Sequence, residues 1–272
     1  MGWEGRPVLW SAEAKFRKGS DHLEALKNEV DAWGKGDVAV LALEANADAT
    51  EHSLIHRWTE EPPIVRWGVL IGDCVHNFRS SLDHAVYELA VAKTGADPPP
   101  YADALAFPIC DTDQLFTNAI GRHRLGNLAS DSDLRAALER LQPYCCPRFP
   151  DMPVLAILRD LDDQDKHRIV SIMAAGLRTG ELEMKLPPMD PWPHIRSRIW
   201  TRGPMQESTK VVTLIFDRPA PGVEMSNPNL SLYPVIEVEK LDGTTDVVGL
   251  SAILELIRDE VRYCLDAIRR LL

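Results

Sequence analysis

Polar side chains gather on one face of the helix that residues 72–89 predict. At about 100° per residue, the apolar side chains fall on one side of this helix, and they are Cys74, Val75, Phe78, Leu82, Ala85, Val86 and Leu89. The opposite side carries Asp73, His76, Asn77, Arg79, Ser80, Asp83 and His84. This polar face has no lysine or glutamate of the kind that covers a purely solvated face. Its imidazole, guanidinium, carboxylate and hydroxyl groups can transfer protons and bind anions, so the face is the first candidate for a site.

A second polar cluster follows at residues 160–168, whose sequence is DLDDQDKHR. It lies where a predicted helix ends and a strand-rich region begins, and loops at such boundaries often carry functional side chains. We expect part of this cluster to reach the polar helix face, namely Asp163, Asp165, Lys166, His167 and Arg168. Asp83 would then form an ion pair with Arg168. Alternatively, Arg79 would form one with Asp165.

Three segments together resemble a group of largely uncharacterised bacterial proteins that are common in actinobacteria. The shared pattern is a His-Asn-x-Arg-Ser-x-Leu-Asp-His helix, here residues 76–84, and a later Asp-Lys-His-Arg, here residues 165–168. A Phe-Pro-Ile segment between them, here residues 107–109, also fits. The resemblance covers about the middle third of the chain and implies a family, but it brings no activity with it.

The spacing of Arg79 and His84 also resembles the Arg-x4-His motif of HEPN ribonucleases, which are helical, cut RNA without a metal and usually act as dimers. By this resemblance, Arg79 would stabilise the charge that develops on the phosphate. His84 would act as acid or base near neutral pH, close to the ordinary pKa of histidine. The chain departs from that family in two ways, because Ser80 follows the arginine where Asn, Asp or His is common, and because the second half predicts a sheet.

The best hypothesis from these patterns is an intracellular, metal-independent HEPN-like endoribonuclease or phosphodiesterase-like hydrolase that needs no cofactor. Its catalytic residues would be Arg79 and His84, supported by His76, Asp83 and His167. Its substrate-binding residues would be Asn77, Lys166 and Arg168.

Two alternatives compete with that hypothesis. In the first, the chain is a non-catalytic binding or assembly protein, and its His, Asp and Arg residues form a structural polar network in which every buried group is paired. In the second, it is a metal-dependent hydrolase, because imidazole nitrogens and carboxylate oxygens are ligands for zinc, manganese or iron. The ligands would come from His76, Asp83, His84, Asp163, Asp165 and His167.

The composition of the chain limits the classes of partner that it is expected to bind. The 272 residues carry a formal net charge of −11, which works against broad binding to nucleic acid or anionic membrane, since both are polyanions. No apolar stretch is long enough to cross a bilayer. Five cysteines without a C-x-x-C spacing predict reduced thiols in a cytoplasmic protein. Nucleic acid therefore stays a possible but disfavoured partner, and a homodimer is expected from the HEPN resemblance.

Hydrophobic periodicity predicts an α+β fold in one intertwined domain over residues 1–272. The expected helices are residues 11–33, 64–93, 113–123, 131–141, 151–162 and 250–272. A hairpin is expected from residues 37–45 and 51–59, and a short edge segment from residues 104–110. Residues 1–168 are thus helix-rich, residues 169–248 contain five strand-like runs, and residues 249–272 form a C-terminal helix. We expect the first, central and last helices to form a core that packs on an antiparallel sheet from the second half.

Overall fold

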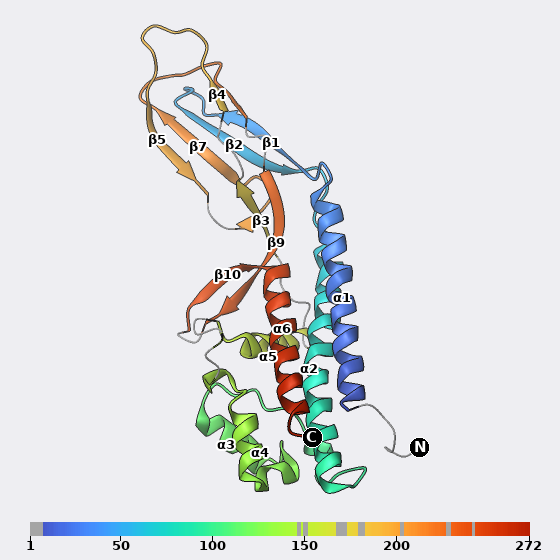
Figure 1. Cartoon of the computed structure of the whole chain (residues 1–272). Helices are drawn as coiled ribbons and strands as arrows, with labels where there is room; N and C mark the ends of the chain where they lie inside the picture. Colours follow the sequence, from blue (N-terminus) through green and yellow to red (C-terminus); the bar gives the residue numbers. More distant parts are fainter. Residues whose placement is uncertain are drawn as a thin grey trace. The chain divides into compact units, whose positions relative to one another are not determined.

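The computed structural model of the chain describes residues 8–145, 148, 152–166, 173–178, 183–201, 204–226, 230–240 and 243–272, with residues 173–178, 204, 226, 230 and 231 described by their backbone alone. The chain divides into two compact units (Figure 1). The helical unit comprises Met1–Lys27, Val65–Ser171 and Glu237–Leu272. The strand unit comprises Asn28–Ile64 and Ile172–Ile236. Each unit therefore combines segments from distant parts of the sequence.

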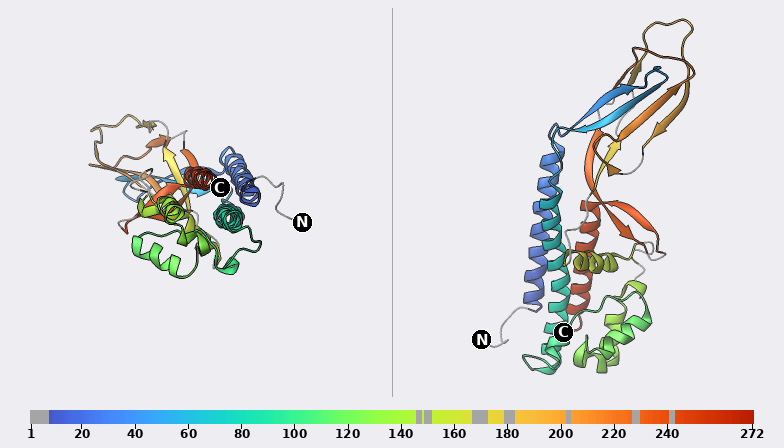
Figure 2. Two further views of the ribbon diagram at one scale, coloured as in Figure 1. Left: turned by 60° about the horizontal axis from the view of Figure 1, so that its bottom comes forward. Right: turned by 180° about the vertical axis from the view of Figure 1, so that it is seen from behind.

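Three long helices lie side by side in the helical unit (Figures 1 and 2). They are α1 (Trp10–Gly34), whose first part belongs to this unit, α2 (Ile64–Thr94) and α6 (Leu250–Arg269). The apolar residues that recur at helical spacing along α6 and the end of the chain are buried except for the terminal Leu272, which is 40% exposed; the buried ones are Leu250, Ile253, Leu254, Ile257, Val261, Leu265 and Ile268. The expected helical core of first, central and last helices is therefore confirmed.

The approach of α1 to α2 is close because one residue lacks a side chain. A Cβ atom at Gly19 would lie 2.8 Å from Cδ1 of Phe78 and 3.2 Å from the carbonyl oxygen of Cys74. The ring of Phe78 also lies 5.6 Å from that of Phe16, measured between centroids. The Arg262 guanidinium of α6 lies 3.9 Å from the centroid of the Phe16 ring. These contacts join the three helices around Phe16.

Shorter helices complete the helical unit. They are α3 (Asp113–Gly121), α4 (Ser132–Glu139), α5 (Val154–Asp165) and the 3₁₀ turns η1 (Ala102–Ala104), η2 (Gly126–Ser130) and η3 (Pro143–Cys145). Thr112 accepts a hydrogen bond from the backbone of Leu115 and begins α3, and Asp131 does the same for α4 through the N–H groups of Asp133 and Leu134. Both are the side-chain caps that the first turn of a helix needs.

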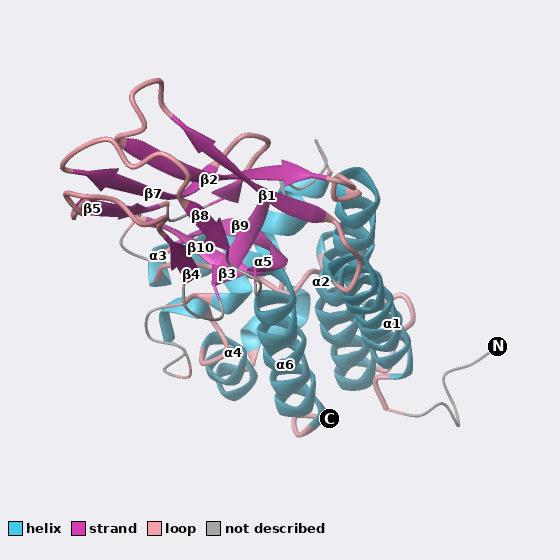
Figure 3. Ribbon diagram, turned by 90° about the horizontal axis from the view of Figure 1, so that it is seen from above, coloured by secondary structure: helices cyan, strands magenta, loops and turns pink. Residues whose placement is uncertain are grey.

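The strand unit is built on antiparallel pairs (Figure 3). Its main sheet has the order β1 (Ala39–Ala45), β2 (Glu51–Trp58), β7 (Lys210–Phe216) and β5 (Ile195–Trp200). The hairpin of β1 and β2 pairs with β7 across a long stretch of sequence, and Ser53 and Thr213 share a hydrogen bond of 2.8 Å at this junction. Leu54, Val212, Leu214 and Phe216 belong to the apolar cluster beneath the sheet.

A second set of strands follows the same antiparallel rule. β3 (Met173–Arg178) pairs with β9 (Leu230–Glu239) and with β6 (Pro204–Met205). In the same sheet, β9 also lies beside β10 (Thr245–Gly249). A separate two-stranded sheet consists of β4 (Glu183–Lys185) and β8 (Glu224–Ser226). Six helices and antiparallel sheets in the described part of the chain confirm the α+β class.

One predicted strand is wrong. An edge segment was expected at residues 104–110, but residues 105–110 form no strand, and residue 104 ends the turn η1. The reason is that both backbone polar groups of Phe107 bind side chains of α2 instead of a neighbouring strand: its N–H donates to Asp83 and its carbonyl accepts from Arg79.

Two further expectations from the sequence concern membrane-spanning helices and the cysteines. Among the described residues, no helix combines the length and apolar character that a membrane crossing needs. Cys74, Cys110 and Cys145 are free thiols, Cys264 is buried, and Cys146 lies outside the described residues.

We expect the substitution Gly19→Ala to lower the free energy of unfolding by about 1–3 kcal/mol, because the added methyl group meets Phe78 and the backbone of α2. Gly121→Ala is the matched control, since a Cβ at Gly121 would meet nothing within 4 Å. Urea unfolding of both variants measures the difference. Equal stabilities would contradict a close approach of α1 to α2 at Gly19.

Candidate active site

A cavity of about 480 Å³ opens in the helical unit beside α2. The backbone segment 106–110 and residues of α2, α3 and α5 surround it. Its ionisable lining side chains are His76, Arg79, Asp83, Arg124, Arg159, Asp162, Asp163 and Lys166. The polar face of α2 and the end of α5 therefore meet, as the sequence led us to expect.

Gly72 lets α5 approach α2. A Cβ atom at this position would collide with the carboxylate of Asp165, in the last turn of α5. Leu155, Leu158 and Leu161 are buried on one side of α5, and Asp162 and Asp165 continue the same side at helical spacing. Packing of these leucines thus directs the acidic end of α5 toward the polar face of α2.

His76 stands between a hydroxyl and a buried carboxylate. Its Nε2 lies 3.4 Å from Oγ of Ser80, and its Nδ1 lies 3.4 Å from Oδ1 of Asp162. The side chain of His76 is 56% exposed, whereas that of Asp162 is only 4% exposed. Lys166 contacts the other oxygen of Asp162, Oδ2, at 2.7 Å. The order Ser–His–Asp is that of a relay in which a carboxylate orients an imidazole.

The charge of Asp162 is balanced from one side only. Hydrogen bonds to Asp162 and Asp163 raise the pKa of Lys166 above its ordinary range, so the lysine stays protonated. Oδ1 of Asp162 has no hydrogen bond within the described part of the chain, although it is shielded from solvent. A buried carboxylate oxygen without a donor can accept a hydrogen bond from Nδ1 of His76, the nearest nitrogen.

Arg79 and Asp83 fix the segment that forms one wall of the cavity. Nη2 of Arg79 lies 2.8 Å from the carbonyl oxygen of Phe107 and 3.0 Å from Oδ1 of Asp83. The N–H of Phe107 donates to the same Oδ1 at 2.8 Å. Burial raises the pKa of Asp83, although the guanidinium of Arg79 and this N–H work in the opposite direction. Nη1 of Arg79 has no hydrogen-bond partner among the described residues.

Two more arginines line the cavity. Arg159 donates to Asp111 and Asp160 at 2.8 Å each, and it holds the carbonyl oxygen of Ile109 at 3.4 Å. Arg124 is exposed and forms no ion pair with a described residue. Together with Arg79 and Lys166, they give the cavity four cationic groups.

His84 lies elsewhere. Its Nδ1 is 3.0 Å from Oγ of Ser11, and that hydroxyl donates to Glu88. Because the serine has one proton to give, His84 must be the donor to Ser11. Glu88 also accepts from the backbone N–H groups of Ser11 and Ala12, so this network holds the start of α1 on α2. The structure therefore does not bring Arg79 and His84 to one place.

The remaining predicted residues fall into three groups. Asn77 donates to the carbonyl oxygen of Asp73 on its own helix and does not line the cavity. His167 and Arg168 lie outside the described residues, so the predicted pair of Asp83 with Arg168 lies there too. The alternative pair of Arg79 with Asp165 is replaced by the pair of Arg79 with Asp83.

The described residues contain no cluster of three or more His, Cys, Asp or Glu side chains fit to hold a metal ion.

Sequence reasoning missed Asp162, Arg124 and Arg159. A signal existed for Asp162, because it follows the buried Leu155 and Leu158 at helical spacing and so had to face inward. An acidic residue on an apolar stripe indicates a paired, buried charge. No comparable signal marks Arg124, whose place at the cavity depends on the loop after α3.

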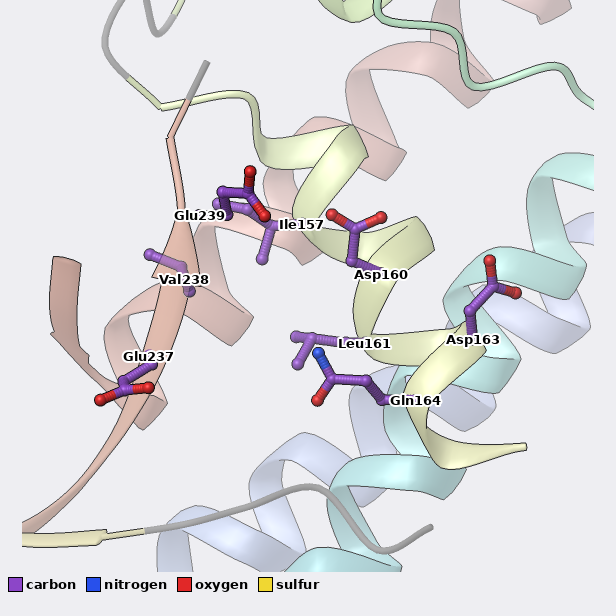
Figure 4. A pocket seen from close by; sticks show the side chains of 8 residues that line it. All are labelled: Ile157, Asp160, Leu161, Asp163, Gln164, Glu237, Val238 and Glu239. Carbon is purple, nitrogen blue, oxygen red and sulfur yellow. The ribbon is translucent and has the colours of Figure 1, made fainter. Parts of the chain in front are cut away.

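A second cavity, of about 420 Å³, lies between α5 and the end of β9 (Figure 4). Its lining carries four carboxylates, those of Asp160, Asp163, Glu237 and Glu239. None of its lining side chains is a cation. Such a lining repels anions, and no lining residue combines deep burial with an unpaired polar atom. The first cavity is therefore the better candidate for chemistry.

The pH dependence of stability tests the environment of His84. Burial, followed by the charge of Lys15, lowers the pKa of His84 below its ordinary value of about 6.5. The unfolded chain therefore binds a proton at this residue at a higher pH than the folded chain does. We expect the free energy of unfolding to fall as the pH drops below about 6.5, and His84→Asn to weaken this fall.

Urea unfolding between pH 5 and pH 8 measures both slopes. Because His56 and the other histidines are unchanged in the variant, the difference belongs to His84 and its network. Identical slopes in the two proteins would contradict the buried, cation-flanked position of His84.

Comparison of the chain with known protein families, with curated proteins and with solved structures finds no match. The likeness of residues 76–84 and 165–168 to a bacterial family, and of Arg79 and His84 to HEPN ribonucleases, stays an interpretation of short motifs. The cavity and the groups around it are what supports a function.

Proposed function

We propose that the chain is a metal-independent hydrolase of phosphodiesters, with His76 as its general acid and base. One observation carries the proposal: His76 lies between Ser80 and the buried Asp162 at a cavity that four cationic side chains line. Endoribonuclease activity is the narrower form of the same proposal, since RNA is a phosphodiester.

The His76–Asp162 pair supports proton transfer. A buried carboxylate holds the imidazole in one orientation and stabilises the imidazolium that forms when Nε2 takes a proton. At 3.4 Å the contact is longer than a strong hydrogen bond, and such contacts often tighten only when substrate binds. Lys166 contacts Oδ2 of Asp162 at 2.7 Å and so holds the carboxylate beside His76.

The four cations support binding of a phosphate group. Arginine side chains bind phosphate oxygens through paired N–H groups and stabilise charge that develops during phosphoryl transfer. The lining carries three carboxylates against its four cations, and Asp111 and Asp160 pair with Arg159 from outside the lining, so the site has little net positive charge. A phosphodiester carries one negative charge, whereas a phosphomonoester approaches two at neutral pH. The balance therefore favours a diester.

This proposal moves the acid–base role from His84 to His76. His84 is occupied by Ser11 at the start of α1 and is absent from the cavity lining. Arg79 keeps the role that the HEPN resemblance implies, namely stabilisation of phosphate charge. The groups named here supply acid–base chemistry and charge stabilisation from the chain itself.

A structural role is the second candidate, and two networks favour it for part of the polar face. Arg79 and Asp83 fix the backbone of Phe107, and His84 fixes Ser11. His76 differs from these groups, because its ring is more than half exposed at the cavity and its contacts with Ser80 and Asp162 are both as long as 3.4 Å. This contrast favours catalysis at His76.

Hydrolysis of bis(p-nitrophenyl) phosphate, of p-nitrophenyl phosphate and of a single-stranded RNA oligonucleotide tests the proposal, with and without EDTA. We expect the two diesters to be cleaved faster than the monoester and EDTA to have no effect. His76→Gln should lower kcat about 10²–10⁴-fold, the usual contribution of general acid–base catalysis. Asp162→Asn should lower kcat while leaving KM nearly unchanged.

His22→Gln is the matched control, because His22 lies on α1 outside the cavity lining and forms no ion pair within the described part of the chain. Melting temperatures show that each variant is folded. Full activity of a folded His76→Gln protein, or no cleavage of any diester by the wild type, would overturn the proposal.

A further inference from the structure

We infer that Ser80 is the nucleophile of this hydrolase, so that the reaction passes through a covalent phosphoseryl intermediate. The inference rests on the proposed function, because it assigns a step within the same site. It adds a residue that neither motif resemblance assigns to catalysis.

The hydroxyl of Ser80 is oriented differently from three other hydroxyls on the long helices. Ser20, Ser81 and Thr94 donate to a backbone carbonyl oxygen three or four residues earlier, at 3.0, 2.7 and 2.7 Å. This is the ordinary arrangement for a hydroxyl within a helix. Oγ of Ser80 instead lies 3.4 Å from Nε2 of His76, one helical turn earlier. Ser11 of α1 also lies beside an imidazole, that of His84, but its hydroxyl donates to Glu88, whereas the proton of Ser80 can pass to Nε2 of His76.

The base is in turn oriented by a third group. Residues four apart lie on one face of a helix, which places Ser80 and His76 side by side on α2. Asp162 reaches the far nitrogen of the same ring from α5. Its Oδ1 is shielded from solvent and has no hydrogen bond within the described residues, so it gains a partner when the imidazole becomes charged. A nucleophile, a base and an orienting carboxylate are thus aligned on two rigid helices.

Ser80 also faces the place where an anion would bind. It lines the 480 Å³ cavity, and so does its neighbour Arg79. Nη1 of Arg79 is shielded from solvent and has no partner among the described residues, so a small turn of the side chain toward the cavity would let an oxygen of a bound phosphate group satisfy this donor. The attacking oxygen and a phosphate-binding cation therefore come from consecutive residues.

Hydrolysis through Ser80 takes place in two steps, formation and then hydrolysis of the phosphoseryl intermediate. Oγ of Ser80 attacks phosphorus, and its proton passes to Nε2 of His76. The bond between phosphorus and the leaving alcohol breaks, and His76 returns the proton to that oxygen. Water then attacks phosphorus, gives a proton to His76, and the bond between phosphorus and Oγ breaks as Oγ takes the proton back. The products are one alcohol and one phosphate monoester, and Ser80 is regenerated.

Labelling with diisopropyl fluorophosphate tests the inference directly, because an activated serine forms a bond to its phosphorus and releases fluoride. Intact mass and peptide mapping should find one adduct, at Ser80. Ser80→Ala should remove this adduct and lower diester hydrolysis at least 10²-fold. His76→Gln should slow labelling by a similar factor, which a merely structural role of the ring would not do.

Ser81→Ala is the matched control, since Ser81 is the buried neighbour whose hydroxyl already bonds to Phe78, and it should label like the wild type. The wild-type protein alone decides the main point, whatever the stability of the variants. Diester hydrolysis without an adduct at Ser80 would overturn the inference and leave the proposed function standing, with water as the direct nucleophile. An adduct at Ser80 without diester hydrolysis would support the nucleophile and overturn the phosphodiesterase.

Discussion

The buried carboxylate of Asp162 is the constraint on which the site depends. A charge that is 96% shielded from water costs several kcal/mol unless nearby groups compensate for it. Lys166 compensates one oxygen, and His76 stands at the other. Both contacts hold the end of α5 against the middle of α2, and loss of Lys166 would leave the buried charge with the long contact to His76 alone. The exposed ring of His76 is thereby held where the cavity opens.

The polar face of α2 contacts three different parts of the chain, namely the start of α1, the backbone at Phe107 and the end of α5. His84 holds the start of α1 through Ser11, and Arg79 with Asp83 holds the backbone at Phe107. His76 and Ser80 face the cavity and α5. Satisfied buried networks stabilise one packing, whereas exposed and incompletely paired groups at a cavity are available for chemistry. A single helix therefore combines structural and catalytic candidates within nine residues.

Much of the fold followed from periodicity, because long apolar stripes leave few alternatives. The stripe of α6 and the polar face of α2 are both visible in the sequence. The pairing of β2 with β7 is not, since strands distant in sequence meet through a register that local patterns do not encode. The short strands β6, β8 and β10 were also missed, because two to five residues give no reliable alternation.

The site could be predicted only in part. Arg79 and His84 are five residues apart, which separates their side chains by about 140° around a helix, so helical geometry alone already directs them to different neighbours. Asp162 was recoverable from its spacing to Leu158. The wall at Phe107 was not, because the Phe-Pro-Ile pattern suits an edge strand, and only the tertiary contacts with Arg79 and Asp83 determine its conformation.

The tautomer of His76 tests the central claim most directly. If Asp162 orients the ring, the neutral imidazole carries its proton on Nδ1, and Nε2 is free to accept a proton from Ser80. Nitrogen-15 NMR of histidine-labelled protein reports this, with the signal assigned by its loss in His76→Gln. We expect the Nδ1–H tautomer in the wild type and its loss in Asp162→Asn. A predominant Nε2–H tautomer in the wild type, unchanged by Asp162→Asn, would contradict the proposed relay.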